Sequence, residues 1–182
     1  MVALSRFITL FHRQWAVRVL VELQRSRGAK FVSLHNRLGV GRATLRATLD
    51  DLIAEGWVLR NPGHGHPMRP EYVLAAAGVQ LAPCLGRLLG TVRRLEIEPI
   101  AFRKWTMPVT LALGDAPHRF GELRRQLPGI TPRALTLSLK DLQGERLVHR
   151  EVFDDYPPVT SYSLDRRARP VYRALVPLAR AL

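Results

Sequence analysis

The sequence predicts a mainly helical α+β fold with small β-hairpins, built from two similar units in tandem. Three observations predict it: an internal repeat of about 90 residues, leucines at helical spacing in each half, and pairs of short strand-like runs separated by turn residues. The chain has 182 residues, of which 47% are apolar and 24% are charged. This length and composition suit one large domain or two small ones with a buried core.

The internal repeat divides the chain into two halves. When the sequence is shifted by about 90 residues, matching residues occur in the same order in both halves. The matched pairs include Arg13 and Arg103, Trp15 and Trp105, Leu45 and Leu135, Leu49 and Leu139, Asp51 and Asp141, Leu52 and Leu142, Tyr72 and Tyr162, and Leu74 and Leu164. Paired Trp and Tyr positions in a constant order favour duplication over chance. We therefore expect two homologous domains, residues 1–95 and residues 96–182.

The sequence predicts the same succession of helices in each half. A first helix runs through 13–23 and 103–113, and a short helix follows at 33–38 and 120–127. A tight turn containing glycine comes next, at 39–41 and 128–130. The longer helices at 42–55 and 132–145 carry leucines every three or four residues, which gives each of them one buried face. Thr131 and Pro132 are the N-cap and first position of the second longer helix.

Strand pairs follow these helices in both halves. Strands are predicted at 57–61 and 71–75, and again at 147–153 and 160–164, with prolines confined to the turns. Further helices are expected at 79–95 and 170–182. A β-hairpin directly after a helix-turn-helix is a wing. The sequence therefore predicts two tandem winged helix-turn-helix domains forming a pseudo-dimer.

The charge of the chain favours a polyanionic partner. There are 28 Lys and Arg against 15 Asp and Glu, which gives a net charge of +13. Both halves share this excess, so it is not the property of a basic tail. Nucleic acid is the partner that such a balance favours first.

Several other classes of function are disfavoured. The lone Cys84 cannot form an internal disulfide or a multi-thiolate site, so neither a metal nor another cofactor is expected. The sequence lacks a nucleophile elbow, a zinc-protease motif and a phosphate-binding glycine loop, so we do not expect an enzyme. No run of residues is apolar enough for a membrane span, and the first residues do not form a secretory signal, which favours a cytoplasmic protein.

The second half carries the most specific motifs. They are Arg-Lys-Trp-Thr at 103–106, Arg-Phe-Gly-Glu-Leu-Arg-Arg at 119–125, Leu-Pro-Gly-Ile-Thr-Pro-Arg-Ala-Leu-Thr at 127–136, and Pro-Pro-Val-Thr-Ser-Tyr-Ser-Leu at 157–164. In these residues the sequence resembles the HxlR family of bacterial winged-helix transcriptional regulators. The first half resembles the same superfamily more loosely. The resemblance implies binding of double-stranded DNA, with helices 42–55 and 132–145 in major grooves and the wings on the adjacent backbone.

Side chains off the leucine stripes are the expected DNA contacts. On the two longer helices, those expected to reach base edges or phosphates are Arg42, Arg46, Thr48, Arg133, Thr136 and Lys140. The expected phosphate contacts elsewhere are Arg124 and Arg125 on the preceding helix, and His64, His66 and Arg69 on the first wing. Because the two sets differ, we expect an imperfectly palindromic site with the two helices about 34 Å apart.

The sequence departs from the family pattern in three places, one of which is Leu137, on helix 132–145, where a polar residue is more usual. Arg93 and Arg94 stand near the position of a cysteine that some members use as a thiol sensor, so sensing by that route is not expected. Val159 replaces a basic residue after the Pro-Pro pair, and Asp154 and Asp155 precede it. These carboxylates repel phosphate, which predicts weak DNA contact by the second wing.

The residues alone leave other functions open. A nucleoid-associated or replication-initiator protein, which binds DNA without strong sequence preference, has the same charge and elements. Tandem winged helices also serve as protein–protein interaction modules. The family usually forms homodimers, so the helices at 79–95 and 170–182 are candidate contacts between two chains. No residue identifies a small-molecule effector.

Overall fold

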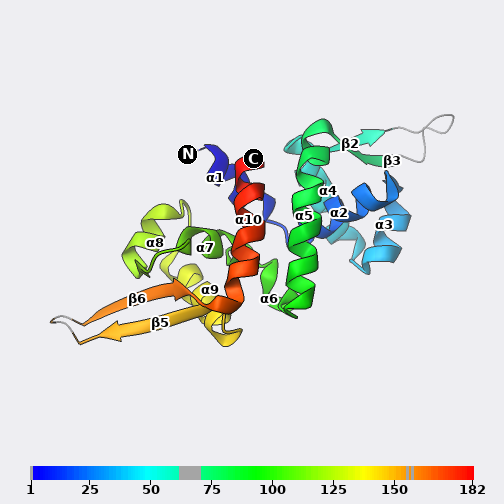
Figure 1. Cartoon of the computed structure of the whole chain (residues 1–182). Coiled ribbons are helices and arrows are strands. Elements are labelled where there is room, and N and C mark those ends of the chain that lie inside the picture. Colours follow the sequence, from blue (N-terminus) through cyan, green and yellow to red (C-terminus); the bar gives the residue numbers. More distant parts are fainter. Residues whose placement is uncertain (1, 62–70, 155, 157) are drawn as a thin grey trace.

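The computed structural model describes residues 2–61, 71–154, 156 and 158–182, and it contains two units with the same order of elements (Figure 1). The first unit comprises α1 (Val2–Leu10), α2 (Ala16–Ser26), β1 (Ala29–Lys30), α3 (Phe31–Leu38), α4 (Arg42–Ala54), β2 (Val58–Asn61), β3 (Glu71–Leu74) and α5 (Ala76–Arg94). The second comprises α6 (Glu98–Ala101), α7 (Thr106–Leu113), β4 (His118–Arg119), α8 (Phe120–Gln126), α9 (Pro132–Gly144), β5 (Val148–Phe153), β6 (Val159–Leu164), the 3-10 helix η1 (Arg166–Ala168) and α10 (Arg169–Ala181). The predicted fold class, tandem winged helix-turn-helix units, is confirmed.

Each unit has a three-stranded antiparallel sheet with the same strand order, β1-β3-β2 in the first and β4-β6-β5 in the second. Ala29 pairs with Tyr72, and His118 pairs with Tyr162. The strands β1 and β4 were not predicted, because two residues are too few to show an alternating pattern.

Equivalent contacts recur in the two units. The Ala75 N–H donates to the Trp57 carbonyl at 3.0 Å, and the Asp165 N–H donates to the Leu147 carbonyl at 2.9 Å. Each bond joins the residue after the second wing strand to the residue just before the first wing strand. The repeat found in the sequence is therefore a repeat of structure.

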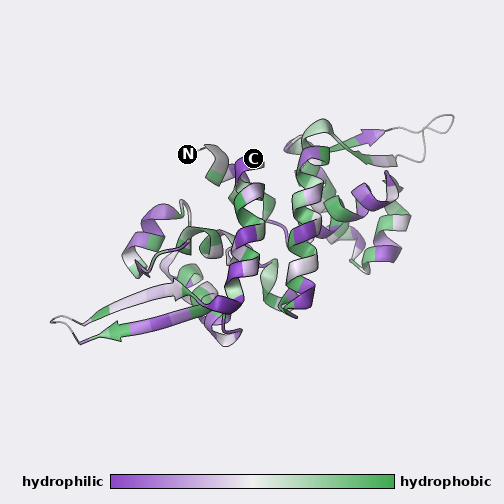
Figure 2. Cartoon of the chain, in the orientation of Figure 1, coloured by the Kyte–Doolittle hydropathy of each residue, from purple (hydrophilic) through white to green (hydrophobic). Residues whose placement is uncertain are grey.

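The helices α5 and α10 lie side by side in the middle of the molecule, with the two wings at opposite ends (Figure 1). Leu85 and Leu88 of α5 and Leu175 and Leu178 of α10 are fully buried, and both helices carry hydrophilic residues on other faces (Figure 2). We call this contact the seam. We expected these two helices as candidate contacts between chains, but their apolar faces pack against one another within one chain.

The helix α1 was not predicted, and it closes the first unit against the end of the second. Phe7 of α1 is fully buried in the core, and α1 contacts α10. Arg6 donates one hydrogen bond to the Leu182 carbonyl at 3.4 Å and another to the Glu55 carbonyl at 3.5 Å. The ends of the chain therefore lie close together (Figure 1).

A charged contact also joins the units. Nη2 of Arg18, in α2, lies 3.2 Å from Oε1 of Glu98, in α6. The Arg18 guanidinium stacks on two rings, with its carbon 4.7 Å from the Trp15 centroid and 5.2 Å from the Phe102 centroid. An arginine held by a carboxylate and two aromatic faces is well suited to fix the relative position of the units.

Candidate nucleic-acid interface

In the first unit, a glycine sets the turn between α3 and α4. Gly39 follows α3 with a φ of +62°, in the left-handed region where glycine is least strained. Its N–H donates to the His35 carbonyl at 3.0 Å, and His35 Nδ1 lies 2.7 Å from the Val40 carbonyl oxygen. These bonds fix the direction in which α4 leaves the turn, and α4 then begins at Arg42.

The outward face of α4 carries two exposed arginines. Arg42 stands at the start of the helix and Arg46 one turn later. The Arg46 guanidinium carbon lies 5.5 Å from the centroid of the Phe31 ring in α3, which restricts the side chain to the outer edge of the helix pair. Asp50 is also exposed on α4, so this face is of mixed charge.

The prediction for Thr48 is wrong. Its side chain is fully buried, and its hydroxyl donates to the Thr44 carbonyl at 2.8 Å. Thr48 comes three residues after Leu45 and four before Leu52, so it lies on the leucine stripe rather than off it. The helical spacing alone could have excluded it from the candidate contacts.

The second unit begins its helix pair with stronger caps. The Thr131 hydroxyl accepts a hydrogen bond from the Ala134 N–H at 3.1 Å, as predicted for an N-cap residue. At the start of α8, the Glu122 carboxylate accepts from the Arg119 N–H at 2.7 Å. Arg124 and Arg125 are both exposed on α8.

The outward face of α9 differs from that of α4. Arg133, Thr136 and Lys140 are exposed, and the Thr136 hydroxyl donates to the Pro132 carbonyl at 2.9 Å. Between them Leu137 is 51% exposed. Lys140 occupies the position equivalent to Asp50, so the second face has a positive charge where the first has a negative one.

One aspartate on each long helix is paired with an arginine from the segment before α2 or α7. Nε of Arg13 lies 2.7 Å from Oδ2 of Asp51, and Nη1 of Arg103 lies 2.5 Å from Oδ2 of Asp141. Since these pairs are substantially exposed, each adds at most about 1 kcal/mol to stability. Their second effect is electrostatic, because a paired carboxylate repels a nearby phosphate less than a free one.

Toward its tip the second wing presents apolar and acidic side chains, whereas His149 and Arg150 are exposed in the first half of β5. Val152 is 48% exposed and Phe153 43% exposed, Asp154 is also exposed, and Tyr156 is fully on the surface. No arginine or lysine is found among the described residues 152–154, 156 and 158–164. For the first wing, the predicted contacts His64, His66 and Arg69 lie outside the described residues.

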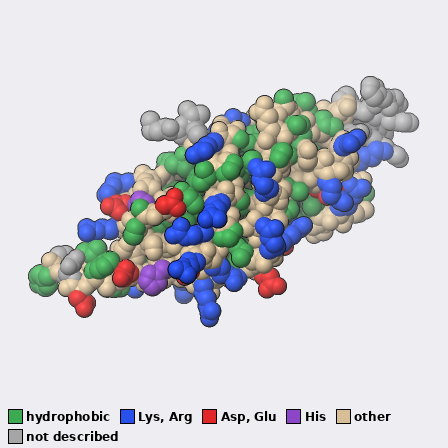
Figure 3. Space-filling model, in the orientation of Figure 1, with side chains coloured by type: hydrophobic (Ala, Val, Ile, Leu, Met, Phe, Trp, Pro, Cys, Tyr) green, Lys and Arg blue, Asp and Glu red, His purple; other side chains and the backbone are tan. Residues whose placement is uncertain are grey.

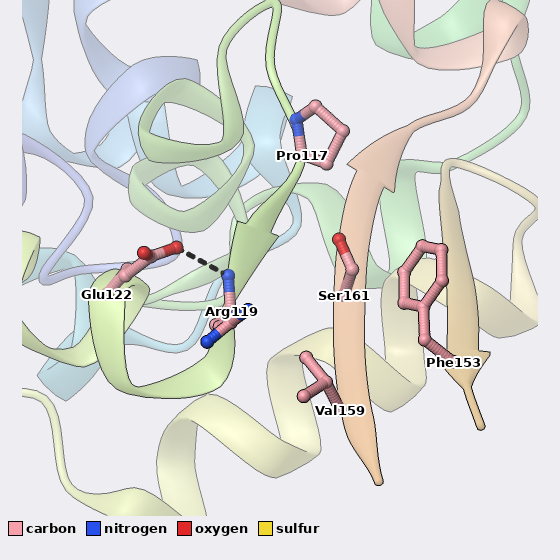
Figure 4. Close-up of a pocket in the computed structure, with 6 residues that line it drawn as sticks. All are labelled: Pro117, Arg119, Glu122, Phe153, Val159 and Ser161. Carbon is pink, nitrogen blue, oxygen red and sulfur yellow. Dashed lines mark hydrogen bonds between the residues drawn. The ribbon is translucent and has the colours of Figure 1, made fainter. Parts of the chain in front are cut away.

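A hollow of about 370 Å³ lies beside the second wing, next to β4 and α8 (Figure 4). Arg119 of β4 and Glu122 of α8 line one side of it, and Phe153 and Val159 of the wing line the other. Sequence reasoning did not select Arg119, because the strand that places it beside the wing is only two residues long. Arg119 is exposed and adds a positive charge between α8 and the wing.

Comparison with known proteins identifies the family. The model of the HxlR-like helix-turn-helix family matches residues 10–95 and again residues 100–180. The uncharacterised HTH-type transcriptional regulator YybR of Bacillus subtilis is 42% identical over 66 residues, which cover 36% of this chain and 53% of that protein. The regulator BH0655 of Halalkalibacterium halodurans is 35% identical over 86 residues, covering 43% of this chain and 76% of that protein.

Among solved structures, a MarR-family transcriptional regulator from Porphyromonas gingivalis W83 aligns with a TM-score of 0.45 and 29% identity, over 47% of this chain and 83% of that one. The chain spans about half the length of several curated relatives that it matches. In the part of the chain that the structure describes, no helix is long and apolar enough to span a membrane. Since the family model matches nearly all of both units, the chain belongs to the HxlR-like helix-turn-helix family and carries two copies of that unit in tandem.

Proposed function

We propose that the chain is a transcriptional regulator that binds double-stranded DNA, with α4 and α9 in two major grooves of an imperfectly palindromic site. In this proposal residues 1–95 and 96–182 are the two DNA-binding domains. The observation that carries it is the presence, in both units of this family fold, of a long helix after a tight turn with exposed arginines on its outward face. That placement suits contact with base edges and phosphates.

The residues proposed to contact bases are Arg42 and Arg46 in α4 and Arg133, Thr136 and Lys140 in α9. Arginine is suited to guanine because its planar fork can donate two hydrogen bonds to the O6 and N7 atoms. Arg124 and Arg125, together with His64, His66 and Arg69 of the first wing, are proposed phosphate contacts. They position the protein on the duplex without reading its sequence.

The two half-sites are expected to be unlike. Equivalent positions carry Arg46 in α4 and Thr136 in α9, and likewise Asp50 and Lys140. An aspartate disfavours nearby phosphate and can accept from cytosine, whereas a lysine favours phosphate or guanine. Because one chain holds both units, their effective concentration for each other is on the order of millimolar, and both half-sites are bound without recruiting a second chain.

The test is selection of bound duplexes from random DNA, followed by fluorescence anisotropy on the selected site across a salt series. We expect an imperfect palindrome that is bound at least about a thousandfold more tightly than random DNA. The slope of log affinity against log salt concentration should correspond to roughly 5 to 8 neutralised phosphates. Arg46→Ala and Arg133→Ala should each weaken specific binding by about 1–3 kcal/mol. Arg180→Ala, which removes one charge at the end of α10, is the matched control.

Each other outcome points to a different function. Tight binding without sequence enrichment would indicate a nucleoid-type protein, and absence of binding at low salt would indicate a protein-interaction module. If Arg46→Ala and Arg133→Ala bind the selected site as tightly as the parent, the assignment of base contacts is wrong.

A further inference from the structure

A groove of about 590 Å³ runs along the seam between α5 and α10. Arg87, Gly90, Thr91 and Arg94 line it from α5, and Arg173 lines it from α10. Lys and Arg side chains are numerous on the face of the molecule where these two helices lie side by side, while Asp and Glu side chains are few there (Figure 3). The groove thus brings three arginines together from both units.

None of these three arginines has an acidic partner among the described residues. Arg87 donates to the Cys84 sulfur at 3.1 Å, and Arg94 donates to the Thr91 hydroxyl at 3.2 Å, but neither they nor Arg173 form an ion pair within the described part of the chain. By contrast Arg93, the neighbour of Arg94, lies 3.7 Å from Glu98. The positive charge of the groove is therefore uncompensated, and an oxyanion would find donors from two helices.

Thr91 holds Arg94 in place. The threonine is 6% exposed, and its hydroxyl donates to the Arg87 carbonyl at 2.9 Å. That bond directs a hydroxyl lone pair toward Arg94, which fixes the guanidinium at the edge of the groove. Restricting a long side chain before a ligand arrives reduces the entropy lost on binding.

Two glycines leave room between the arginines. A Cβ atom built on Gly86 or on Gly90 would meet no atom within 4 Å, so both face open space. Gly90 lines the groove, so the Cβ atom of a larger side chain at this position would enter open space there. The site can therefore be blocked while every arginine is retained.

We propose that this groove binds a small multivalent anion carrying phosphate or carboxylate groups, held by Arg87, Arg94 and Arg173. Such a ligand bridges the two units at the seam, because its donors come from both. Binding of the anion does not depend on the DNA-binding proposal. A change in the spacing of α4 and α9 on anion binding, and the change in DNA affinity that would follow, rest on that proposed function.

The test is isothermal titration calorimetry of the full chain with inorganic pyrophosphate, and in parallel with citrate, at constant ionic strength and without DNA. We expect saturable binding of one anion per chain. The double variant R94A/R173A should weaken it by about tenfold or more, because each arginine supplies charge-assisted hydrogen bonds. Gly90→Met should weaken it equally with all arginines present, while Arg180→Ala, with one charge fewer on the same helix, should bind as the parent does.

Circular dichroism of each variant ensures that lost binding does not reflect unfolding. The proposal is overturned if the parent binds neither anion, or if R94A/R173A and Gly90→Met bind as well as the parent, since the interaction is then diffuse. It is also overturned if these variants lose affinity for duplex DNA and the parent binds neither anion, because the arginines then contact DNA. Failure of DNA binding by the parent leaves the calorimetric result unaffected, so the two proposals fail separately.

Discussion

Replacing glycine by alanine should have opposite effects at two positions of α5. At Gly78 the helix passes so close to the preceding wing that a Cβ atom would lie 2.1 Å from the Trp57 carbonyl oxygen and 3.3 Å from Leu74 Cδ2. At Gly86, eight residues further along the same helix, a Cβ atom would meet nothing within 4 Å. Comparing Gly78→Ala with Gly86→Ala therefore separates the steric cost of an added Cβ atom from the gain in helix propensity.

The magnitude follows from these distances. Alanine in place of a helical glycine stabilises a helix by about 0.5–1 kcal/mol, and Gly86→Ala should gain that amount. At Gly78 the helix has to move by more than about 1 Å, a shift that costs about 1–3 kcal/mol as overpacking. The shift also stretches the 3.0 Å bond from the Ala75 N–H to the same carbonyl. Gly78→Ala should therefore destabilise the protein by about 1–4 kcal/mol in total.

Urea denaturation followed by circular dichroism measures both changes, and thermal melting gives a second reading. For a chain of this size about 2–4 °C correspond to each kcal/mol. The midpoint of Gly78→Ala should therefore fall by several degrees, and that of Gly86→Ala should rise by about 1–4 °C. If Gly78→Ala is as stable as Gly86→Ala, then α5 does not approach Trp57 as described, and the reasoning fails.

Substitutions at three further residues probe stability. Thr131→Ala removes the cap of α9 and should cost about 1 kcal/mol in urea denaturation, whereas Thr131→Ser should retain most of the stability. Hydrogen bonds from Arg25, and then from Arg37, hold the pKa of the Glu22 carboxyl below its ordinary value. The stability that Glu22 contributes is therefore present at neutral pH and is lost as the pH falls through the lowered pKa. The difference in free energy of unfolding between the parent and Glu22→Gln should shrink below about pH 4.5 in urea denaturation. A difference that stays constant with pH would contradict this. Phe7→Ala should cost about 3–5 kcal/mol, and a negligible loss would show that α1 is not part of the core.

The sequence was informative wherever local chemistry determines structure. The long helices were predicted to begin at Arg42 and Pro132, and both do. Leucine spacing identified their buried faces, and Thr131 is the N-cap that its residue type predicts. These features depend on residues within a few positions of one another, so one turn of helix contains all the information needed.

Features that depend on residues far apart in the sequence were not predicted. The helix α1 contacts α10 at the other end of the chain, and its own first turn carries no acidic residue. The helix α5 begins at Ala76 instead of Val79, in a stretch without a capping side chain. Arg119 became a candidate only when β4 placed it beside the wing, and the groove of three arginines required two helices from different units to meet.

The contact between Arg18 and Glu98 has an evolutionary consequence. In a dimer of identical chains each contact across the two-fold axis occurs twice, so every substitution there is felt on both sides. Here the residues equivalent to Arg18 and Glu98 in the other unit are Pro108 and Ile8, neither of which is charged. The ion pair therefore occurs once, and it could arise without altering a second copy of itself. Holding both units in one chain therefore removes the requirement of self-complementarity at this contact, so either half can change there without a matching change in the other.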